Sequence, residues 1–261
     1  MKYLKKSLGQ NFLSDKNIIK KIVGLVDVNN KNIIEIGPGN GALTDEILKN
    51  NPKSITLVEK DNLLAQDLKK KYSSMEFLKV YNDDILKFDI EKLKIKDSII
   101  FGNLPYNISS QILIKILNFK KWPPDFNDLI FMFQKELGDK IIGKYPSLNY
   151  GRLSIITSYR LEVIKKFLVS QNCFFPKPKV KSMVIQLKPR LNKEFIIKKI
   201  KNLEKITNIF FSNKRKMINK NIKKVLDENQ INMVSQLNLK MRPAEIKPDI
   251  YYKITELIEK N

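Results

Sequence analysis

The sequence contains no histidine, and it contains a single cysteine, Cys173. The absence of histidine excludes catalytic units in which an imidazole base activates a serine or cysteine nucleophile. Together with the single cysteine, it excludes zinc sites built from cysteine and histidine, and one thiol cannot form an internal disulfide. Any chemistry must therefore depend on carboxylates, amides, aromatic rings, lysines or a bound cofactor.

Long apolar runs are also missing from the chain. No stretch approaches the roughly 20 apolar residues that a transmembrane helix requires. The first residues, Met1 to Leu4, do not have the pattern of a secretory signal. We therefore expect a cytoplasmic protein that has no membrane partner.

Acidic residues are few relative to basic ones, with 27 Asp and Glu against 49 Lys and Arg and a formal net charge of +22. A charge of this sign indicates a polyanionic partner, most simply nucleic acid. Because the basic residues are nearly all lysines, a bias that a genome poor in G and C produces, the sign is more informative than the size. The candidate RNA contacts are Lys2, Lys5, Lys6, Lys177, Lys179, Lys181, Lys214, Arg215 and Lys216.

Short apolar runs alternate with helical patterns through most of the 261 residues. This alternation predicts an α/β fold with a mostly parallel sheet and helices on both faces. From about Asn192 the apolar spacing becomes purely helical. We predict a catalytic domain over residues 1–190 and a small helical domain over residues 191–261. The expected strands cover residues 32–36, 55–61, 77–81, 98–101, 129–133, 163–169 and 183–187.

Two local features are expected from turn and helix signals. Ser14 is a candidate N-cap for a helix whose apolar face runs from Ile18 to Val26. Residues 145–150 are expected to form an exposed loop before a segment that resumes as helix or strand at Arg152.

Polar residues and glycines follow several of the predicted strands, at the edge where parallel sheets bind ligands. The glycines of residues 37–41 let a ligand approach the backbone closely. Glu59 lies at the end of the second strand and suits the two hydroxyls of a ribose, and Asp84 follows the third and can accept from an adenine amine. The glycine turn lacks the dinucleotide fingerprint, whose third glycine would replace Ala42. The set describes an adenosine-containing cofactor.

The fourth strand leads into Asn103-Leu104-Pro105-Tyr106. The Asn103 amide can donate and accept hydrogen bonds, Pro105 fixes the turn, and the Tyr106 ring offers a face for stacking. These properties suit the binding of a planar amine. An ordinary strand-to-helix loop with a surface tyrosine is the alternative.

Several motifs together resemble a known family. The Glu-x-Gly-x-Gly-x-Gly form of residues 35–41 resembles S-adenosylmethionine-dependent methyltransferases, which have a Rossmann-like sheet. With four further motifs in the same order, nearly the whole chain is similar to the ribosomal RNA adenine dimethyltransferase family, above all its bacterial small-subunit (16S) branch. The further motifs are residues 9–13 (Gly-Gln-Asn-Phe-Leu), 103–109, 150–154 and 174–180.

The resemblance implies S-adenosylmethionine as cofactor and two adjacent adenosines in a terminal hairpin loop of 16S rRNA as substrate. It implies that the enzyme acts on a pre-30S small subunit and has a role in ribosome assembly, and we expect it to be a monomer. No metal is required, because the proton can leave after methyl transfer. The implied cofactor contacts are Asn11, Leu13, Gly37, Gly39, Glu59, Asp84 and Asn103, with Asp61 as a substitute for Glu59.

The family pattern also implies roles around the target base. The Asn103 side chain and the Leu104 carbonyl would accept hydrogen bonds from the adenine amine, while Tyr106 and Phe174 would stack on the flipped base. Phe175 adjoins Phe174, so the identity of the stacking ring is open, and the spacing to the following prolines favours Phe174.

Two alternative functions remain at this point. One is a 23S rRNA adenine methyltransferase, which shares the core, and the other is a non-catalytic assembly or transcription factor with the same fold. Residues 150–154 and 103–106 favour the small-subunit enzyme, and the intact Asn103 and Tyr106 argue against a non-catalytic factor.

Overall fold

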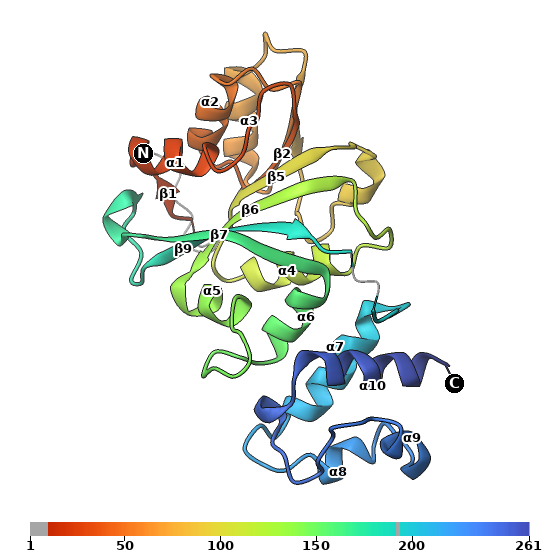
Figure 1. Ribbon diagram of the computed structural model, residues 1–261. Coiled ribbons are helices and arrows are strands. Elements are labelled where there is room, and N and C mark those ends of the chain that lie inside the picture. The colour runs from red at the N-terminus through yellow and green to blue at the C-terminus, as the bar shows by residue number, and fades with distance from the viewer. Residues whose placement is uncertain (1–9, 192–193, 261) are drawn as a thin grey trace. The chain divides into compact units, whose positions relative to one another are not determined.

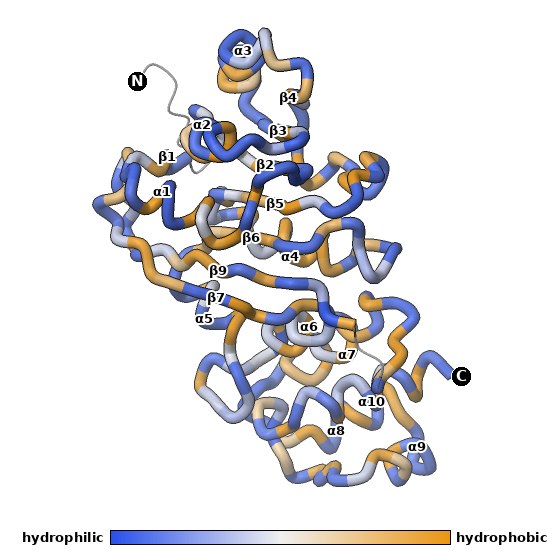
Figure 2. Tube along the Cα trace, turned by 45° about the horizontal axis from the view of Figure 1, so that its top comes forward, coloured by the Kyte–Doolittle hydropathy of each residue, from blue (hydrophilic) through white to orange (hydrophobic). Residues whose placement is uncertain are grey.

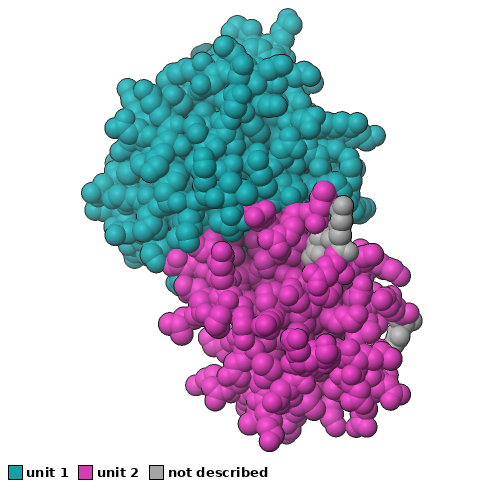
Figure 3. Space-filling model, in the orientation of Figure 1, with its two compact units in different colours: residues 1–138, 163–189 teal, residues 139–162, 190–261 magenta. Residues whose placement is uncertain are grey.

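The computed structural model describes residues 10–191 and 194–260, and it divides into two compact units (Figures 1 and 3). The first unit comprises residues 1–138 and 163–189, and the second comprises residues 139–162 and 190–261. Residues 139–162 therefore pack with the C-terminal region, although they were expected within the catalytic domain. Lys2, Lys5 and Lys6 lie outside the described residues.

The first unit is built on a seven-stranded sheet with the order β4-β3-β2-β5-β6-β9-β7. The five strands from β4 to β6 are parallel to their neighbours, and β9 pairs with β6 in the antiparallel direction. The predicted α/β class with a mostly parallel sheet is confirmed. The strands are β2 (Asn32–Ile36), β3 (Ser54–Glu59), β4 (Leu78–Asn82), β5 (Ser98–Asn103), β6 (Phe126–Gln134), β7 (Leu161–Val169) and β9 (Ser182–Pro189).

The central strands are apolar along their length because both faces of the sheet are covered (Figure 2). On one face, α1 (Lys16–Val23), α2 (Ala42–Leu48) and α3 (Asn62–Lys71) contribute to a hydrophobic cluster with strand residues such as Ile33, Leu57 and Phe101. On the other face lies α4 (Ser109–Leu117), whose Ile112, Leu113 and Ile116 are fully buried (Figure 1). Short segments η2 (Ile90–Leu93), η3 (Gln171–Cys173) and α5 (Lys135–Ile141) connect the larger elements.

The N-cap of α1 differs from the prediction. The Asp15 carboxylate accepts hydrogen bonds from the main-chain N–H groups of Asn17 and Ile18, so Asp15 and not Ser14 caps the helix. The Ser14 hydroxyl and N–H both donate to the carbonyl of Cys173. Ser14 therefore ties the N-terminal segment to η3 rather than beginning a helix.

The second unit is helical and contains α6 (Arg152–Arg160), α7 (Ile200–Phe211), α8 (Asn219–Ile222), α9 (Glu228–Asn232), η4 (Pro243–Glu245) and α10 (Pro248–Lys260). Buried tyrosines connect these elements. The Tyr150 hydroxyl donates to the carbonyl of Ile246, and the Tyr251 hydroxyl donates to that of Pro243. Because Tyr150 is buried, the expectation that all of residues 145–150 are exposed was wrong, although Leu148 is fully exposed.

Among the residues that the structure describes, no helix combines the length and the apolar character needed to cross a membrane.

Candidate active site

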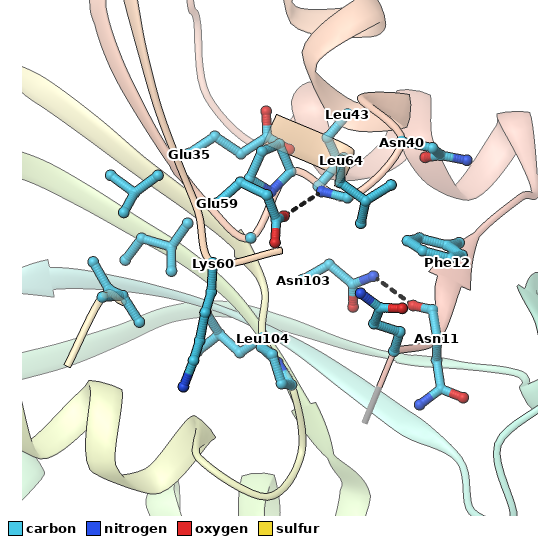
Figure 4. Close-up of a pocket in the computed structure, with 18 of the residues that line it drawn as sticks. Asn11, Phe12, Glu35, Asn40, Leu43, Glu59, Lys60, Leu64, Asn103 and Leu104 are labelled. Atoms are coloured by element: carbon cyan, nitrogen blue, oxygen red, sulfur yellow. Dashed lines mark hydrogen bonds between the residues drawn. The ribbon is translucent and has the colours of Figure 1, made fainter. Parts of the chain in front are cut away.

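A cavity of the first unit lies where the carboxyl ends of β2, β3 and β5 meet (Figure 4). This is the edge of a parallel sheet at which ligands bind. The cavity brings together residues that lie far apart in the sequence. Its lining includes the predicted residues Asn11, Leu13, Gly37, Gly39, Glu59, Asp84, Asn103, Leu104 and Tyr106.

The glycine turn between β2 and α2 forms one wall of the cavity. Gly37 and Gly39 have φ values of 66° and 60°, a backbone conformation that residues with a Cβ rarely adopt. A Cβ added at Gly39 would also lie 2.8 Å from the Phe12 ring. Glycine is therefore required at this position both by its backbone angle and by the close approach of Phe12.

Glu59 connects the end of β3 to this turn. Its carboxylate accepts a hydrogen bond from the N–H of Gly39 at 3.0 Å (Figure 4) and another from the N–H of Asp61 at 2.8 Å. Burial raises the pKa of the Glu59 carboxyl above its ordinary value. Asp61, the alternative to Glu59, instead caps α3 through the N–H groups of Leu63 and Leu64, so Glu59 is the acid that faces the cavity.

Asp84 lies in the loop after β4, in a more open environment. One of its oxygens accepts from the Lys60 ammonium at 2.8 Å, and the other accepts from the N–H of Leu86 at 2.9 Å. The hydrogen bond from Lys60 holds the pKa of Asp84 below its ordinary value. Ile85 adds an apolar contact to the cavity beside this acid.

Asn103 ends β5, and its amide has a defined orientation. The Nδ2 group donates to the carbonyl oxygen of Asn11 at 3.0 Å (Figure 4). A carbonyl can only accept, so the atom of Asn103 that faces it must be the amide nitrogen. The amide oxygen, Oδ1, is consequently the atom that remains for accepting a hydrogen bond from a ligand.

Tyr106 follows in the turn that begins at Asn103. Its hydroxyl forms a 2.5 Å hydrogen bond with the hydroxyl of Ser182, the first residue of β9. Burial raises the pKa of the Tyr106 hydroxyl above its ordinary value. The hydrogen bond fixes the ring at the cavity from its outer end.

Two sequence motifs that lie about 160 residues apart pair as a small antiparallel ribbon. β1 (Phe12–Leu13) pairs with β8 (Phe174–Phe175), so that Phe12 is opposite Phe175 and Leu13 is opposite Phe174. Paired residues of a ribbon point to the same face. Leu13 and Phe174 belong to the hydrophobic core, with Phe174 only 4% exposed, whereas Phe175 is 51% exposed.

This burial bears on the choice of stacking ring. Phe174 does not line the cavity, and its role as a stacking ring stays a prediction. Phe175 shares its ribbon face with Phe12, which does line the cavity.

Glu35 lies beneath the glycine turn and is almost inaccessible to solvent. The Thr44 hydroxyl donates to its carboxylate at 2.6 Å. Burial raises the pKa of Glu35 to about 7 despite this hydrogen bond. The cavity thus contains a carboxyl group that changes charge near neutral pH.

The chain was compared with known proteins, and the match extends over nearly its whole length. The family model described as ribosomal RNA adenine dimethylase matches residues 1–260. The ribosomal RNA small subunit methyltransferase A of Pelagibacter ubique is 45% identical over 98% of this chain and 97% of its own length. The protein of the same name in Malacoplasma penetrans is 37% identical over 97% of this chain and 91% of its own. The chain belongs to the ribosomal RNA adenine dimethylase family.

Solved structures agree with this family at the level of the fold. A dimethyladenosine transferase from Plasmodium falciparum matches with a TM-score of 0.76 and 23% identity, over 95% of this chain and 98% of that one. The 23S rRNA methyltransferase ErmE matches with a TM-score of 0.70 and 23% identity, over 95% and 99%. The Rossmann-like methyltransferase fold with a helical C-terminal region, expected for an rRNA adenine dimethylase, is confirmed.

Some cavity residues were not singled out from the sequence. Phe12 packs against the glycine turn, Lys60 binds Asp84, and Ile85 lines the wall next to it. Phe12 lies inside one of the family motifs, and that motif was its available signal. For Lys60 and Ile85 the only signal was their position beside Glu59 and Asp84.

Proposed function

We propose that the protein transfers methyl groups from S-adenosylmethionine to the N6 amines of two adjacent adenosines in a terminal hairpin loop of 16S rRNA. The observation that carries this proposal is the shared cavity, in which the glycine turn, Glu59 and Asp84 lie with the Asn103 turn. The names of the relatives at 37% to 45% identity also support the small subunit as substrate.

The cavity fits S-adenosylmethionine in its chemistry. A Cβ added at Gly37 would meet no atom closer than 3.9 Å, so the backbone of the glycine turn is open to the cavity at that position. Glu59 would accept from the ribose hydroxyls, and Asp84 would accept from the adenine amine beside Ile85. When bound, this cofactor supplies a methyl group made electrophilic by a sulfonium.

The residues of the Asn103 turn would prepare the target amine. An adenine amine is a poor nucleophile because its lone pair is delocalised into the ring. Asn103 Oδ1 and the Leu104 carbonyl would accept its two N–H bonds, which directs the lone pair out of the ring plane and toward the cofactor. The Tyr106 ring, fixed by Ser182, would stack on the base, and positioning of this kind accounts for much of the rate.

The RNA surface would include exposed basic residues of both units. Lys177, Lys179 and Lys181 follow β8, and Lys214, Arg215 and Lys216 follow α7 in the second unit; all six are exposed. Such contacts predict RNA binding that weakens as the salt concentration rises. We propose that the second unit assists in docking on a pre-30S subunit and that the enzyme acts as a cytoplasmic monomer.

The test is methyl transfer from labelled S-adenosylmethionine to purified, unmodified small subunits, with large subunits and free RNA as controls. Label in the adenosines of the small-subunit loop supports the proposal. Label only in the large subunit would instead indicate a 23S rRNA methyltransferase. No transfer to any substrate, with cofactor binding absent, would overturn methyltransferase activity.

A further inference from the structure

The loop that carries Asp84 is held from outside the cavity by a lysine of another element. Lys115 of α4 donates from its ammonium to the carbonyl of Leu86 at 2.9 Å and to the carbonyl of Phe88 at 2.7 Å. The N–H groups of Lys87 and Phe88 in turn donate to the carbonyl of Asp84, each at 2.8 Å. Lys115 therefore closes the end of the same turn that begins at Asp84.

The side chain of Asp84 depends on this turn for its direction. Its Oδ1 accepts a hydrogen bond from the N–H of Leu86, and Lys115 binds the carbonyl of the same residue. Lys60 binds Oδ2 from the opposite side, but its side chain is about half exposed. An exposed ion pair of this type is weak, so the backbone of the loop provides the firmer support for Asp84.

Lys115 also belongs to the helix that directly follows the Asn103 turn. Its ammonium is partly desolvated, which lowers the pKa of Lys115, and both of the acceptors described above are main-chain carbonyls. A charged donor that binds two carbonyls of one loop holds that loop in place. We call these two hydrogen bonds of Lys115 the clamp. The clamp connects α4, the helix that follows the Asn103 turn, to the loop that contains Asp84.

We propose that Lys115 is a positioning residue for cofactor recognition, which holds the loop of residues 84–88 so that Asp84 and Ile85 face the adenine ring. This inference rests on the proposed function. Lys115 does not line the cavity, so it acts through Asp84 and not by touching the ligand. Without the clamp, the loop would occupy its binding-competent form for a smaller fraction of the time, and the apparent Kd would rise in proportion.

The test is isothermal titration of S-adenosylhomocysteine, an unreactive ligand, into the full chain and its variants. Hydrogen bonds from a charged donor are worth enough that Lys115→Met, which keeps the aliphatic stem, should raise Kd roughly tenfold. Lys115→Arg can still donate to two carbonyls and should remain within about threefold of the wild type. If Lys115→Met does not fold, Lys115→Gln, whose polar end is too short for both carbonyls, carries the same prediction.

Lys87→Met is the matched control. Lys87 is exposed in the same loop and its positive charge is felt by Asp84, so this variant removes an equal charge without removing the clamp. Its Kd should stay within about twofold of the wild type. An equal loss in Lys87→Met and Lys115→Met would show that net charge matters and would overturn the positioning role.

A double-mutant cycle shows whether Lys115 acts through Asp84. In the Asp84→Asn background, Lys115→Met should cost much less affinity than it does in the wild type, because the partner it orients is already altered. Hydrogen exchange of the ligand-free protein should be faster at residues 86–88 in Lys115→Met. Additive losses, or unchanged exchange, contradict the inference.

The outcomes for the two proposals are distinguishable. If the wild type binds S-adenosylhomocysteine and Lys115→Met binds equally well, the role of Lys115 is overturned while the proposed function stands. If the wild type does not bind, the proposed function fails and the role of Lys115 fails with it.

Discussion

Two walls of the same cavity are held in different ways. The cofactor wall, defined as residues 37–41 with Glu59, is joined by hydrogen bonds from main-chain N–H groups to one buried carboxylate. The acceptor wall, defined as residues 103–106, is held by side-chain hydrogen bonds to Asn11 and Ser182, which lie 92 and 76 residues away from their partners in sequence.

This difference predicts which property, cofactor affinity or turnover, a substitution in each wall will alter. The cofactor wall is formed within consecutive strands and helices, so its geometry follows from the folding of the sheet. The acceptor wall also requires the N-terminal segment and β9 to be in place. We therefore expect substitutions in the cofactor wall to alter cofactor affinity, and substitutions in the acceptor wall to alter turnover at similar cofactor affinity.

The strongest test of this comparison is Asn103→Ala. It removes the Oδ1 acceptor and also the donor to Asn11, so methyl transfer should fall by roughly 10³-fold, the size of effect seen when one preorganised polar group is removed from an active site. The Kd of S-adenosylhomocysteine should rise only modestly. Single-turnover kinetics and titration measure the two quantities.

Asn103→Asp sharpens this result. It retains an acceptor oxygen but places a carboxylate against the Asn11 carbonyl, so its turnover should lie between those of the wild type and Asn103→Ala. Near-normal turnover in Asn103→Ala would defeat the proposed role of the amide.

Glu35, which is buried beneath the cofactor wall, can be tested in the absence of ligand. Burial raises its pKa in the folded protein from the ordinary value of 4.5 to about 7, so between these pH values the unfolded chain loses the proton while the folded protein keeps it. The raised pKa therefore lowers the free energy of unfolding as pH rises through this window, by about 3 kcal/mol in total. Because a glutamine side chain does not ionise, the free energy of unfolding of Glu35→Gln should not show this decrease.

The measurement is urea unfolding of wild type and Glu35→Gln at pH 5, 6, 7 and 8. The stability of the wild type relative to the variant should decline from pH 5 to pH 7 and then level off by pH 8, because all other titrating groups are common to both chains. If the difference in free energy of unfolding between the two chains stays constant with pH, the pKa of Glu35 is not raised in the folded protein.

Much of the fold could be predicted because its signals are local. Each predicted strand overlaps an observed one, since apolar runs bounded by polar residues identify buried strands. The insertion of β9 between β6 and β7 was not predictable, because strand order depends on pairing between distant segments. Residues 139–162 pack with the helical unit for a similar reason, as the tyrosine contacts of Tyr150 and Tyr252 depend on partners about 100 residues away.

The residues of the candidate site could also be predicted only in part from the sequence. Glycine turns and strand-end acids have fixed places in a parallel sheet, so residues such as Gly39, Glu59 and Asn103 could be assigned to one edge from sequence. The neighbouring phenylalanines could not be distinguished, because adjacent residues of a strand point to opposite faces and spacing alone does not say which face is buried. Phe174 and Phe175 are separated only once β1 is paired with β8.

Glu59→Gln should weaken cofactor binding by roughly tenfold to a hundredfold. The side-chain amide would have to present its NH₂ group to one of two main-chain N–H donors, at Gly39 or Asp61, and a donor facing a donor is unsatisfied. Titration of S-adenosylhomocysteine measures this loss, and RNA affinity measured by filter binding should be nearly unchanged. A variant with normal cofactor affinity and weakened RNA binding would reverse the assignment of the two walls.

The smallest expected effect distinguishes the two phenylalanines of β8. Phe175 is half exposed on the ribbon face of Phe12, so Phe175→Leu should raise KM for the small subunit by roughly tenfold, as expected for one lost stacking contact, with little change in stability. Phe174→Leu should instead lower the free energy of unfolding by roughly 1 to 3 kcal/mol, because its buried ring leaves a poorly filled space in the core.

The pair of variants is matched, since each makes the same substitution at adjacent positions of β8. Steady-state kinetics and urea unfolding give a KM and a free energy of unfolding for each variant. We expect Phe175→Leu to change mainly KM and Phe174→Leu to change mainly the free energy of unfolding. The reverse pattern, in which Phe174→Leu alone raises KM while both variants keep wild-type stability, would return the stacking role to Phe174. It would also mean that the ribbon of β1 and β8 opens when RNA binds, because only an open ribbon exposes the ring of Phe174.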